Sequence, residues 1–433
     1  MGKTWVHERW WYKLAHVCRG WRYLILGSAS HLGLRLICTH GTPVADVLAH
    51  SPPLPLIIDY VRGYPGMTIE DEEGMLLALR HRSRIRRIRL QMHDLNLERL
   101  IMAIDEEFPR LEYLNIALQT KHNIGLILPS TFQAPHLRYL ILRNFTFPGS
   151  SLLTAAVGLV SLWLLEICPS AYFSPNNLLQ QLSLMPQLEN LKLTFHSPVP
   201  NHDVERHLFN TPIVTHVTLP SLRRFAFGGV SAYLEALLPW MTTPLLEKLE
   251  IGFFNQLTFS LPCLLDFMHT KKYLKFCSAK LKFNIDEVTV FVYPRDGTSI
   301  HALCMRVYCG HLDWQVSSVV QIFDVLSPVS SAVEDLTLEY GRHSISLEWN
   351  NEAHRTQWRE LLRSFGNVKT LRVDNYLAMQ VSHSLRLDGE PPLEVLPELK
   401  ELIFSAGIYS SGAVTAFIDA RQIAGHPVDL VYR

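Results

Sequence analysis

Residues 109–116 read PRLEYLNI, and the pattern of this stretch returns five more times in the chain. The pattern is proline, a variable residue, leucine, two variable residues, an apolar residue, a variable residue and a last apolar residue. Chance alone would produce fewer than about one such phrase in a chain of this composition, so it is an internal repeat. The six copies begin at Pro109, Pro135, Pro186, Pro220, Pro244 and Pro397.

The spacing of the apolar residues in this phrase predicts a short strand. In Leu-x-x-Leu-x-Leu the first, fourth and sixth residues can point into one core, while the third and fifth point to the opposite face. The proline has no N–H to give to a helix and favours an extended residue before it, so a preceding helix must end there. Helical spacing does precede it within residues 174–185, where Ser174 and Pro175 open the segment.

The repeat predicts stacked units. Several triplets lie 26 residues apart, as do Ile85, Leu111 and Leu137, or Leu188 and Val214. One unit cannot bury its own apolar stripe, but stacked units share a continuous core. We therefore expect an α/β fold, a leucine-rich-repeat-like solenoid with parallel short strands on one face and helices on the other. Triplets without the proline begin at Ile85, Leu159, Val214, Val333 and Val368.

The solenoid is expected to be irregular. Where such repeats usually carry Asn or Cys after the strand, this chain has Gln119, Phe145, His196 and Phe254. Toward the C-terminus the repeat blurs, with an ordinary strand expected at residues 288–292 and a helix at residues 319–326. We predict two domains, a helical segment at residues 1–45 and one irregular solenoid at residues 46–433.

Composition narrows the functional classes. The chain has 433 residues, 48% of them hydrophobic, and its 40 basic residues equal its 40 acidic ones. A neutral chain has no global field that would draw it to nucleic acid or an anionic membrane, so we expect neither as a partner. Seven cysteines without a Cys-x-x-Cys pair fit reduced thiols. With no signal peptide pattern in the first residues, we expect a cytoplasmic or nuclear protein.

No motif for catalysis is present. The chain lacks the Gly-x-Ser-x-Gly elbow, the Gly-x-Gly-x-x-Gly dinucleotide loop, the phosphate loop and the His-Glu-x-x-His zinc motif. We therefore expect a protein that is not an enzyme and has no catalytic residue, metal site or cofactor.

The N-terminal segment has a different pattern from the repeats. Trp11, Leu14, Cys18, Trp21 and Ile25 recur at helical spacing, which predicts one amphipathic helix that needs a partner surface. A helix that caps the open end of the solenoid would satisfy this pattern, and so would a helix that binds another protein.

Residues 17–22, VCRGWR, resemble the Val-Cys-Arg-x-Trp-Arg phrase in the second half of the F-box, a small three-helix module. The chain resembles a large family of fungal F-box proteins with degenerate leucine-rich repeats, also at residues 34–39, 52–56, 229–235, 253–257, 311–316 and 358–365. The resemblance implies a non-catalytic substrate-receptor subunit of a cullin-RING (SCF-type) ubiquitin ligase. Its F-box would dock on the ligase adaptor protein, and its repeats would hold an unknown client protein.

The resemblance does not include the first half of the F-box, the Leu-Pro-x-Glu phrase with its apolar helix. We expect one of three situations: weak adaptor binding, a remnant that only caps the solenoid, or a truncated gene product. In each case the adaptor or cap contact is expected at Trp11, Leu14, Val17, Trp21 and Leu24.

Client binding is expected on the outward face of the sheet, where side chains are free of packing. Tyr113 and Tyr139 should stand side by side with Arg87 beyond them, an aromatic and arginine composition typical of binding hot spots. The arginines of residues 80–89 are better explained as the basic end of this surface than as a nucleic-acid patch. The predicted face consists of Arg87, Tyr113, Asn115, Tyr139, Asn190, Lys192, Lys248 and Glu250. The alternative to a ubiquitin-ligase receptor is a leucine-rich-repeat scaffold unrelated to ubiquitination.

Overall fold

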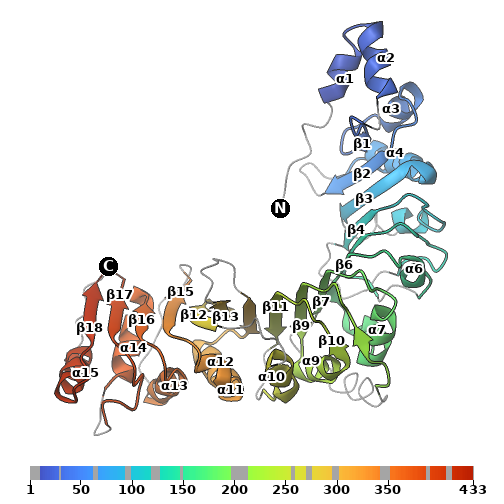
Figure 1. Cartoon of the computed structure of the whole chain (residues 1–433). Helices are drawn as coiled ribbons and strands as arrows, with labels where there is room; N and C mark the ends of the chain where they lie inside the picture. The colour runs from blue at the N-terminus through green and yellow to red at the C-terminus, as the bar shows by residue number, and fades with distance from the viewer. Residues whose placement is uncertain are drawn as a thin grey trace. The chain divides into compact units, whose positions relative to one another are not determined.

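The computed structural model describes residues 10–28, 31–61, 67–92, 99–118, 127–146, 150–196, 213–254, 259–269, 276–294, 302–341, 352–386, 391–405 and 412–432. Of the positions singled out above, Gln119 and residues 255–257 lie outside this set. The chain forms two compact units. Unit 1 is Met1–Tyr172 with Gln181–Asn190, and unit 2 is Phe173–Gln180 with Leu191–Arg433. The fold is mixed α/β with a large, mostly parallel sheet of 16 strands among the described residues (Figure 1), so the α/β part of the expected fold class is correct.

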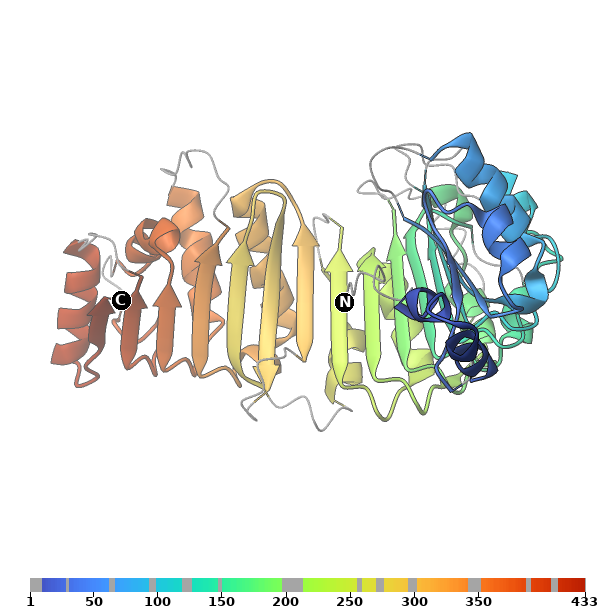
Figure 2. The ribbon, with the colours of Figure 1, turned by 90° about the horizontal axis from the view of Figure 1, so that it is seen from above.

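Unit 1 pairs its strands in chain order, and all of these pairs are parallel. The strands are β1 (Leu36–Cys38), β2 (Leu56–Val61), β3 (Ile85–Met92), β4 (Tyr113–Leu118), β5 (Tyr139–Arg143) and β6 (Ser161–Ile167). The helices are α1 (Trp10–Ala15), α2 (Arg19–Gly27), α3 (Val44–His50), α4 (Ile69–Leu79) and α6 (Ser150–Ala155), with short 3₁₀ turns at Arg82–Arg84 and Pro169–Ala171. Helices α3, α4 and α6 lie on one face of the strands, and α1 and α2 stand at the N-terminal end (Figures 1 and 2).

Unit 2 orders its strands β7 (Asn190–Phe195), β9 (Arg224–Gly229), β11 (Lys248–Phe253), β14 (Leu303–Tyr308), β13 (Glu287–Pro294), β12 (Phe276–Phe283), β15 (Asp335–Tyr340), β16 (Thr370–Val373), β17 (Glu401–Phe404) and β18 (Asp429–Tyr432). Its helices are α9 (Ser231–Leu237), α10 (Pro262–His269), α11 (Leu312–Val325), α12 (Ser327–Ser330), α13 (Glu352–Arg363), α14 (Ala378–Ser384) and α15 (Gly412–Ile423). Helix α7 (Pro175–Leu182) precedes β7 as predicted, with the Ser174 hydroxyl accepting from the Asn177 amide.

Each proline phrase forms a turn that leads directly into a strand. In all six copies the amide of the leucine two residues after the proline donates to the carbonyl before the proline, over 3.0 to 3.4 Å. This places proline at the second position of a β-turn, where its fixed φ fits. The strand then begins four residues after the proline, and all three apolar residues of every copy are at most 3% exposed. The strands that follow are β4, β5, β7, β9, β11 and β17.

The 26-residue spacing is confirmed in unit 1 and fails in unit 2. Ile88 aligns with Leu114, and Leu114 aligns with Leu140. Val214, in contrast, is 74% exposed, and its triplet reaches only β8 (Val217–Thr218), which pairs with β10 (Met241–Thr242) in a separate two-stranded sheet. The prediction that Val214 starts another stacked repeat is therefore wrong, because this segment lies outside the large sheet.

The expectation of parallel strands throughout is wrong at one place in unit 2. Strand β13, the strand predicted at residues 288–292, runs antiparallel to both β12 and β14. Strand β14 then pairs with β11, and β12 pairs with β15, both parallel. An antiparallel meander is thus inserted into the parallel series, with its strands in reverse chain order. The short β12–β13 turn permits this because an antiparallel pair needs no crossover helix.

Candidate functional site

The predicted aromatic and arginine residues meet on the outward face of unit 1. Arg87 aligns with Tyr113 across β3 and β4, and Tyr113 aligns with Tyr139 across β4 and β5. The guanidinium carbon of Arg87 lies 4.1 Å from the Tyr113 ring centroid, a cation–π contact. The two tyrosine ring centroids are 6.1 Å apart. We call Arg87, Tyr113 and Tyr139 the Arg-Tyr row.

A second row of outward residues supports the first. The Asn115 side-chain amide donates to the Tyr113 hydroxyl over 3.2 Å, which orients that ring. Next to Asn115, Arg89 lies 3.8 Å from Asp59 of β2. Burial raises the pKa of the Asp59 carboxyl, while Arg89, Arg87 and His40 act in the opposite direction. The face therefore carries charged groups from β2 and β3 beside the aromatic rings.

A hollow of about 650 Å³ opens beside the Arg-Tyr row, and we call it the unit 1 hollow. Its walls come from residues 33–35 before β1, residues 53–55 before β2, Ile57 and the first residues of β3, β4 and β5. Arg86 and Glu112 form an ion pair of 2.6 Å at its edge. Arg84 donates to the carbonyls of Leu54 and Pro52, which holds the 53–55 wall in place.

The other predicted face residues do not join this cluster. Lys248 and Glu250 of β11 form their own ion pair of 2.6 Å in unit 2. Asn190 and Lys192, both half-buried, alternate with buried leucines along β7. None of these four residues lines the unit 1 hollow. The predicted face therefore divides into a clustered set in unit 1 and separate polar positions elsewhere.

The single N-terminal helix predicted from periodicity is wrong, because the segment folds as two helices. The helical conformation is interrupted before α2. There Cys18 is the N-cap in extended conformation, and its sulfur accepts from the Trp21 amide at 3.4 Å. Arg22 ties the helices together by donating to the Ala15 carbonyl. The predicted contact residues consequently divide: Trp11 is buried, Leu14 is half-buried, and Val17, Trp21 and Leu24 are 64%, 48% and 67% exposed.

Sequence reasoning missed Arg35 and Glu112 as residues of the site. Glu112 stands at the second position of its triplet, 26 residues after Arg86, so the repeat spacing contained the signal for their ion pair. The same position forms the ion pairs Arg223–Glu247 and Glu334–Lys369 in unit 2. No sequence pattern marked Arg35 as a site residue. It precedes the first strand, and only the folding of the chain brings it to the hollow.

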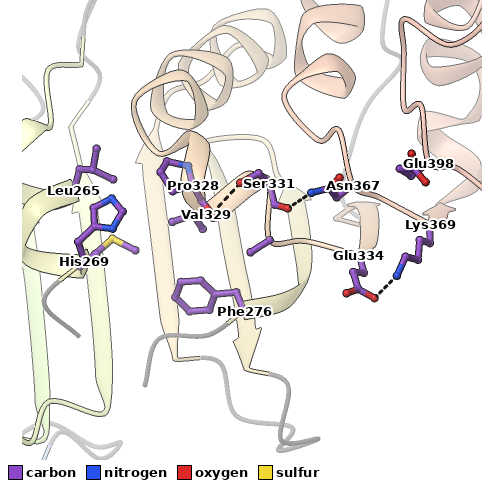
Figure 3. Close-up of a pocket in the computed structure, with 12 residues that line it drawn as sticks. Leu265, His269, Phe276, Pro328, Val329, Ser331, Glu334, Asn367, Lys369 and Glu398 are labelled. Carbon is purple, nitrogen blue, oxygen red and sulfur yellow. Dashed lines mark hydrogen bonds and ion pairs between the residues drawn. The ribbon is translucent and has the colours of Figure 1, made fainter. Parts of the chain in front are cut away.

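Unit 2 has a hollow of its own, of about 610 Å³, near the start of β12 (Figure 3). Its apolar part includes Leu265, Phe276 and Val329. At its polar edge Lys369 pairs with Glu334 over 2.9 Å, and the Asn367 amide donates to the Ser331 carbonyl over 2.6 Å. These polar groups are engaged with one another.

Neither metal ligands nor membrane spans are found in the part of the chain that the structure describes. No group of three or more His, Cys, Asp and Glu side chains there could hold a metal ion. No helix there is long and apolar enough to cross a membrane. Comparison with known protein families and with curated protein sequences finds no match to this chain.

Proposed function

We propose that this chain is a non-catalytic protein-interaction module, related to the substrate-receptor subunits of cullin-RING (SCF-type) ubiquitin ligases and built as an irregular leucine-rich-repeat solenoid. One observation carries the proposal: the Arg-Tyr row stands in register beside a hollow of about 650 Å³. Tyrosine and arginine next to a concavity are the composition that dominates binding energy at protein interfaces. We place client binding at Arg87, Tyr113, Asn115 and Tyr139.

The N-terminal helices supply the adaptor contact in this proposal. Trp21 and Leu24 are three residues apart and share one face of α2, and the exposed Val17 lies just before its N-cap. Exposed apolar side chains grouped in this way are unusual on a monomer and mark an interaction surface. A ubiquitin-ligase receptor of this kind would work in the cytoplasm or nucleus.

A second candidate, a leucine-rich-repeat scaffold without a link to ubiquitin, is favoured by a different observation. Trp11, Ala15 and Ile25 are buried, and Trp11 lines a small hollow with Leu36 of β1 and Val47 of α3. These contacts are what a cap over the first strand requires. In this candidate the exposed α2 residues have no partner.

A pull-down with the ligase adaptor separates the two candidates. We expect Trp21→Ala/Leu24→Ala to lower adaptor capture at least tenfold without changing the circular dichroism spectrum, because both side chains are exposed. Tyr23→Ala is the matched control, since Tyr23 is also exposed on α2 but lies outside this face. Failure of the folded wild-type chain to capture the adaptor would remove the ubiquitin-ligase link and leave the scaffold.

A further inference from the structure

We propose that the unit 1 hollow and the Arg-Tyr row bind a proline-rich segment of a client protein in the polyproline II conformation. This inference rests on the proposed function and adds the conformation and chemistry of the client. The register of the outward residues supports it. Ile57 of β2 aligns with Arg87, Arg87 aligns with Tyr113, and Tyr113 aligns with Tyr139. One line of outward residues therefore crosses four neighbouring strands, and all four residues line the hollow.

The spacing of the strands matches the repeat of a polyproline II helix. Neighbouring strands lie about 4.8 Å apart, so every second strand of the line is about 9.6 Å further on. A polyproline II helix rises about 3.1 Å per residue with three residues per turn, which gives a repeat of about 9.3 Å. Residues i and i+3 of such a segment, laid across the strands, would therefore meet Ile57 and Tyr113, or Arg87 and Tyr139.

The surface along this line is aromatic and apolar. The hollow has an apolar wall of Leu54, Pro55 and Ile57. Tyr139 is 40% exposed, and its ring centroid lies 6.1 Å from that of Tyr113. Grooves lined by aromatic rings are the surfaces on which proline-rich segments dock. Because the φ of proline is already fixed, such a segment loses little conformational freedom when it binds.

Charged groups of opposite sign lie together beside this line, which favours an uncharged segment. Arg86 and Glu112 form an ion pair of 2.6 Å. Arg89 lies 3.8 Å from Asp59. A charged segment would be attracted by one member of each pair and repelled by the other. A segment of proline and other uncharged residues leaves both pairs intact.

The backbone of a polyproline II segment also finds a donor here. Such a segment makes no internal hydrogen bonds, so its carbonyls remain as acceptors. The Tyr113 hydroxyl accepts from the Asn115 side chain over 3.2 Å, which leaves the hydroxyl proton for an outside acceptor. An added β-strand would lack backbone partners, because β3 and β4 each pair with a strand on both sides. A helix would use its carbonyls within its own backbone.

The test is a random decapeptide display library panned against the full chain. Fluorescence anisotropy then measures the affinity of the best selected peptide for the chain and three variants. Tyr113→Ala/Tyr139→Ala removes both rings, and Tyr113→Phe removes one hydroxyl. Tyr308→Ala is the control, because Tyr308 is an outward tyrosine of unit 2 with an exposure of 39%, close to that of Tyr139.

Circular dichroism and thermal unfolding verify that each variant is folded, and Tyr139→Ala alone replaces the double variant if the latter does not fold. We expect the selected peptides to be enriched at least threefold in proline over the input library, with prolines three residues apart. The best peptide should bind at least tenfold more weakly without both rings, about threefold more weakly to Tyr113→Phe, and with unchanged affinity to Tyr308→Ala. Raising the salt concentration from about 0.05 M to about 0.5 M should change its affinity less than twofold, because the segment is uncharged.

Two results would contradict the inference in different ways. Peptides that depend on the two tyrosines but are acidic, or carry apolar residues at helical spacing without proline, would overturn this inference and leave the proposed function intact. Peptides whose binding is indifferent to the loss of both rings would overturn this inference and also the client site in the proposed function.

Discussion

Unit 1 and unit 2 build their strands from the same phrase but present different surfaces on the outward face. In unit 1 the aligned outward residues of β3, β4 and β5 are Arg87, Tyr113 and Tyr139. In unit 2 the aligned outward pairs of β9 and β11 are Arg224 with Lys248, Ala226 with Glu250, and Gly228 with Gly252. The apolar positions are buried equally well in both units. The repeat therefore specifies the core and leaves the surface free to differ.

The small residues of unit 2 change how its surface is filled. A Cβ on Gly252 would come within 3.3 Å of the Tyr308 ring, so that ring lies close over the β11 backbone. Arg306 donates to the Tyr308 hydroxyl and also pairs with Glu287. In unit 1 the large residues stand beside a hollow instead. The outward surfaces of the two units therefore differ in which residues are large and in what lies next to them.

The largest expected effect concerns the arginine that holds the loop before a strand in each unit. In unit 2 Arg421 of α15 is fully buried, and in unit 1 Arg84 is half-buried and donates to two carbonyls. We expect Arg421→Met to lower the free energy of unfolding by about 3 kcal/mol and Arg84→Met by about 1 kcal/mol, because buried carbonyls lose their donors. Arg421 donates over 2.8 to 3.4 Å to the carbonyls of Pro392, Leu396, Pro397 and Leu399.

Denaturant unfolding, monitored by hydrogen exchange in unit 1 and unit 2 separately, measures the difference between the Arg421→Met and Arg84→Met losses. Arg372→Met is the control, since Arg372 is an exposed outward residue of β16, and it should change the free energy of unfolding by less than about 0.5 kcal/mol. Equal losses for Arg84→Met and Arg421→Met would show that burial does not set the strength of this contact.

The sequence predicted the core and the Arg-Tyr row because both depend on the repeat. Tyr113 and Tyr139 occupy the same position of consecutive phrases, and parallel register brings such positions together. The meander at β13 could not be predicted, since alternation within one strand does not reveal its partners. The interruption of the helix at Cys18 could not be predicted. Trp11 and Trp21 have the spacing expected within a single helix, although they lie in two helices, α1 and α2. The position of Arg35 in the hollow could not be predicted, because Arg35 belongs to no copy of the proline phrase.

A change of intermediate size in the free energy of unfolding is expected from two separate glycine-to-alanine substitutions in unit 2, one on the inward and one on the outward face of its strands. Gly229→Ala would place its Cβ 2.9 Å from Phe195 and 3.0 Å from Phe227, both buried, and should lower the free energy of unfolding by about 2 kcal/mol through overpacking. Gly252→Ala faces outward against the half-exposed Tyr308 ring, which can turn away. It should raise that free energy by about 0.5 kcal/mol, because alanine restricts the unfolded chain. Thermal unfolding of both variants measures the contrast, and a loss at Gly252 equal to that at Gly229 would show that the outward surface of unit 2 is packed as tightly as its core.

The smallest effect should make unit 1 more sensitive to acid than unit 2. Burial alone would raise the pKa of the Asp71 carboxyl, but the Gly41 and Thr68 amides and His40 outweigh it and hold the pKa below its usual value. A lowered pKa stabilises the fold above the unfolded value of about 3.9, and this contribution is lost as the pH falls through the folded value. Asp71→Asn, which removes the charged cap of α4, should therefore lower the free energy of unfolding by about 1 kcal/mol at pH 7 and by much less near pH 3. Asp286→Asn, on the exposed β12–β13 turn of unit 2, is the control variant, and an equal pH response of the two variants would mean that the Asp71 contacts do not stabilise unit 1.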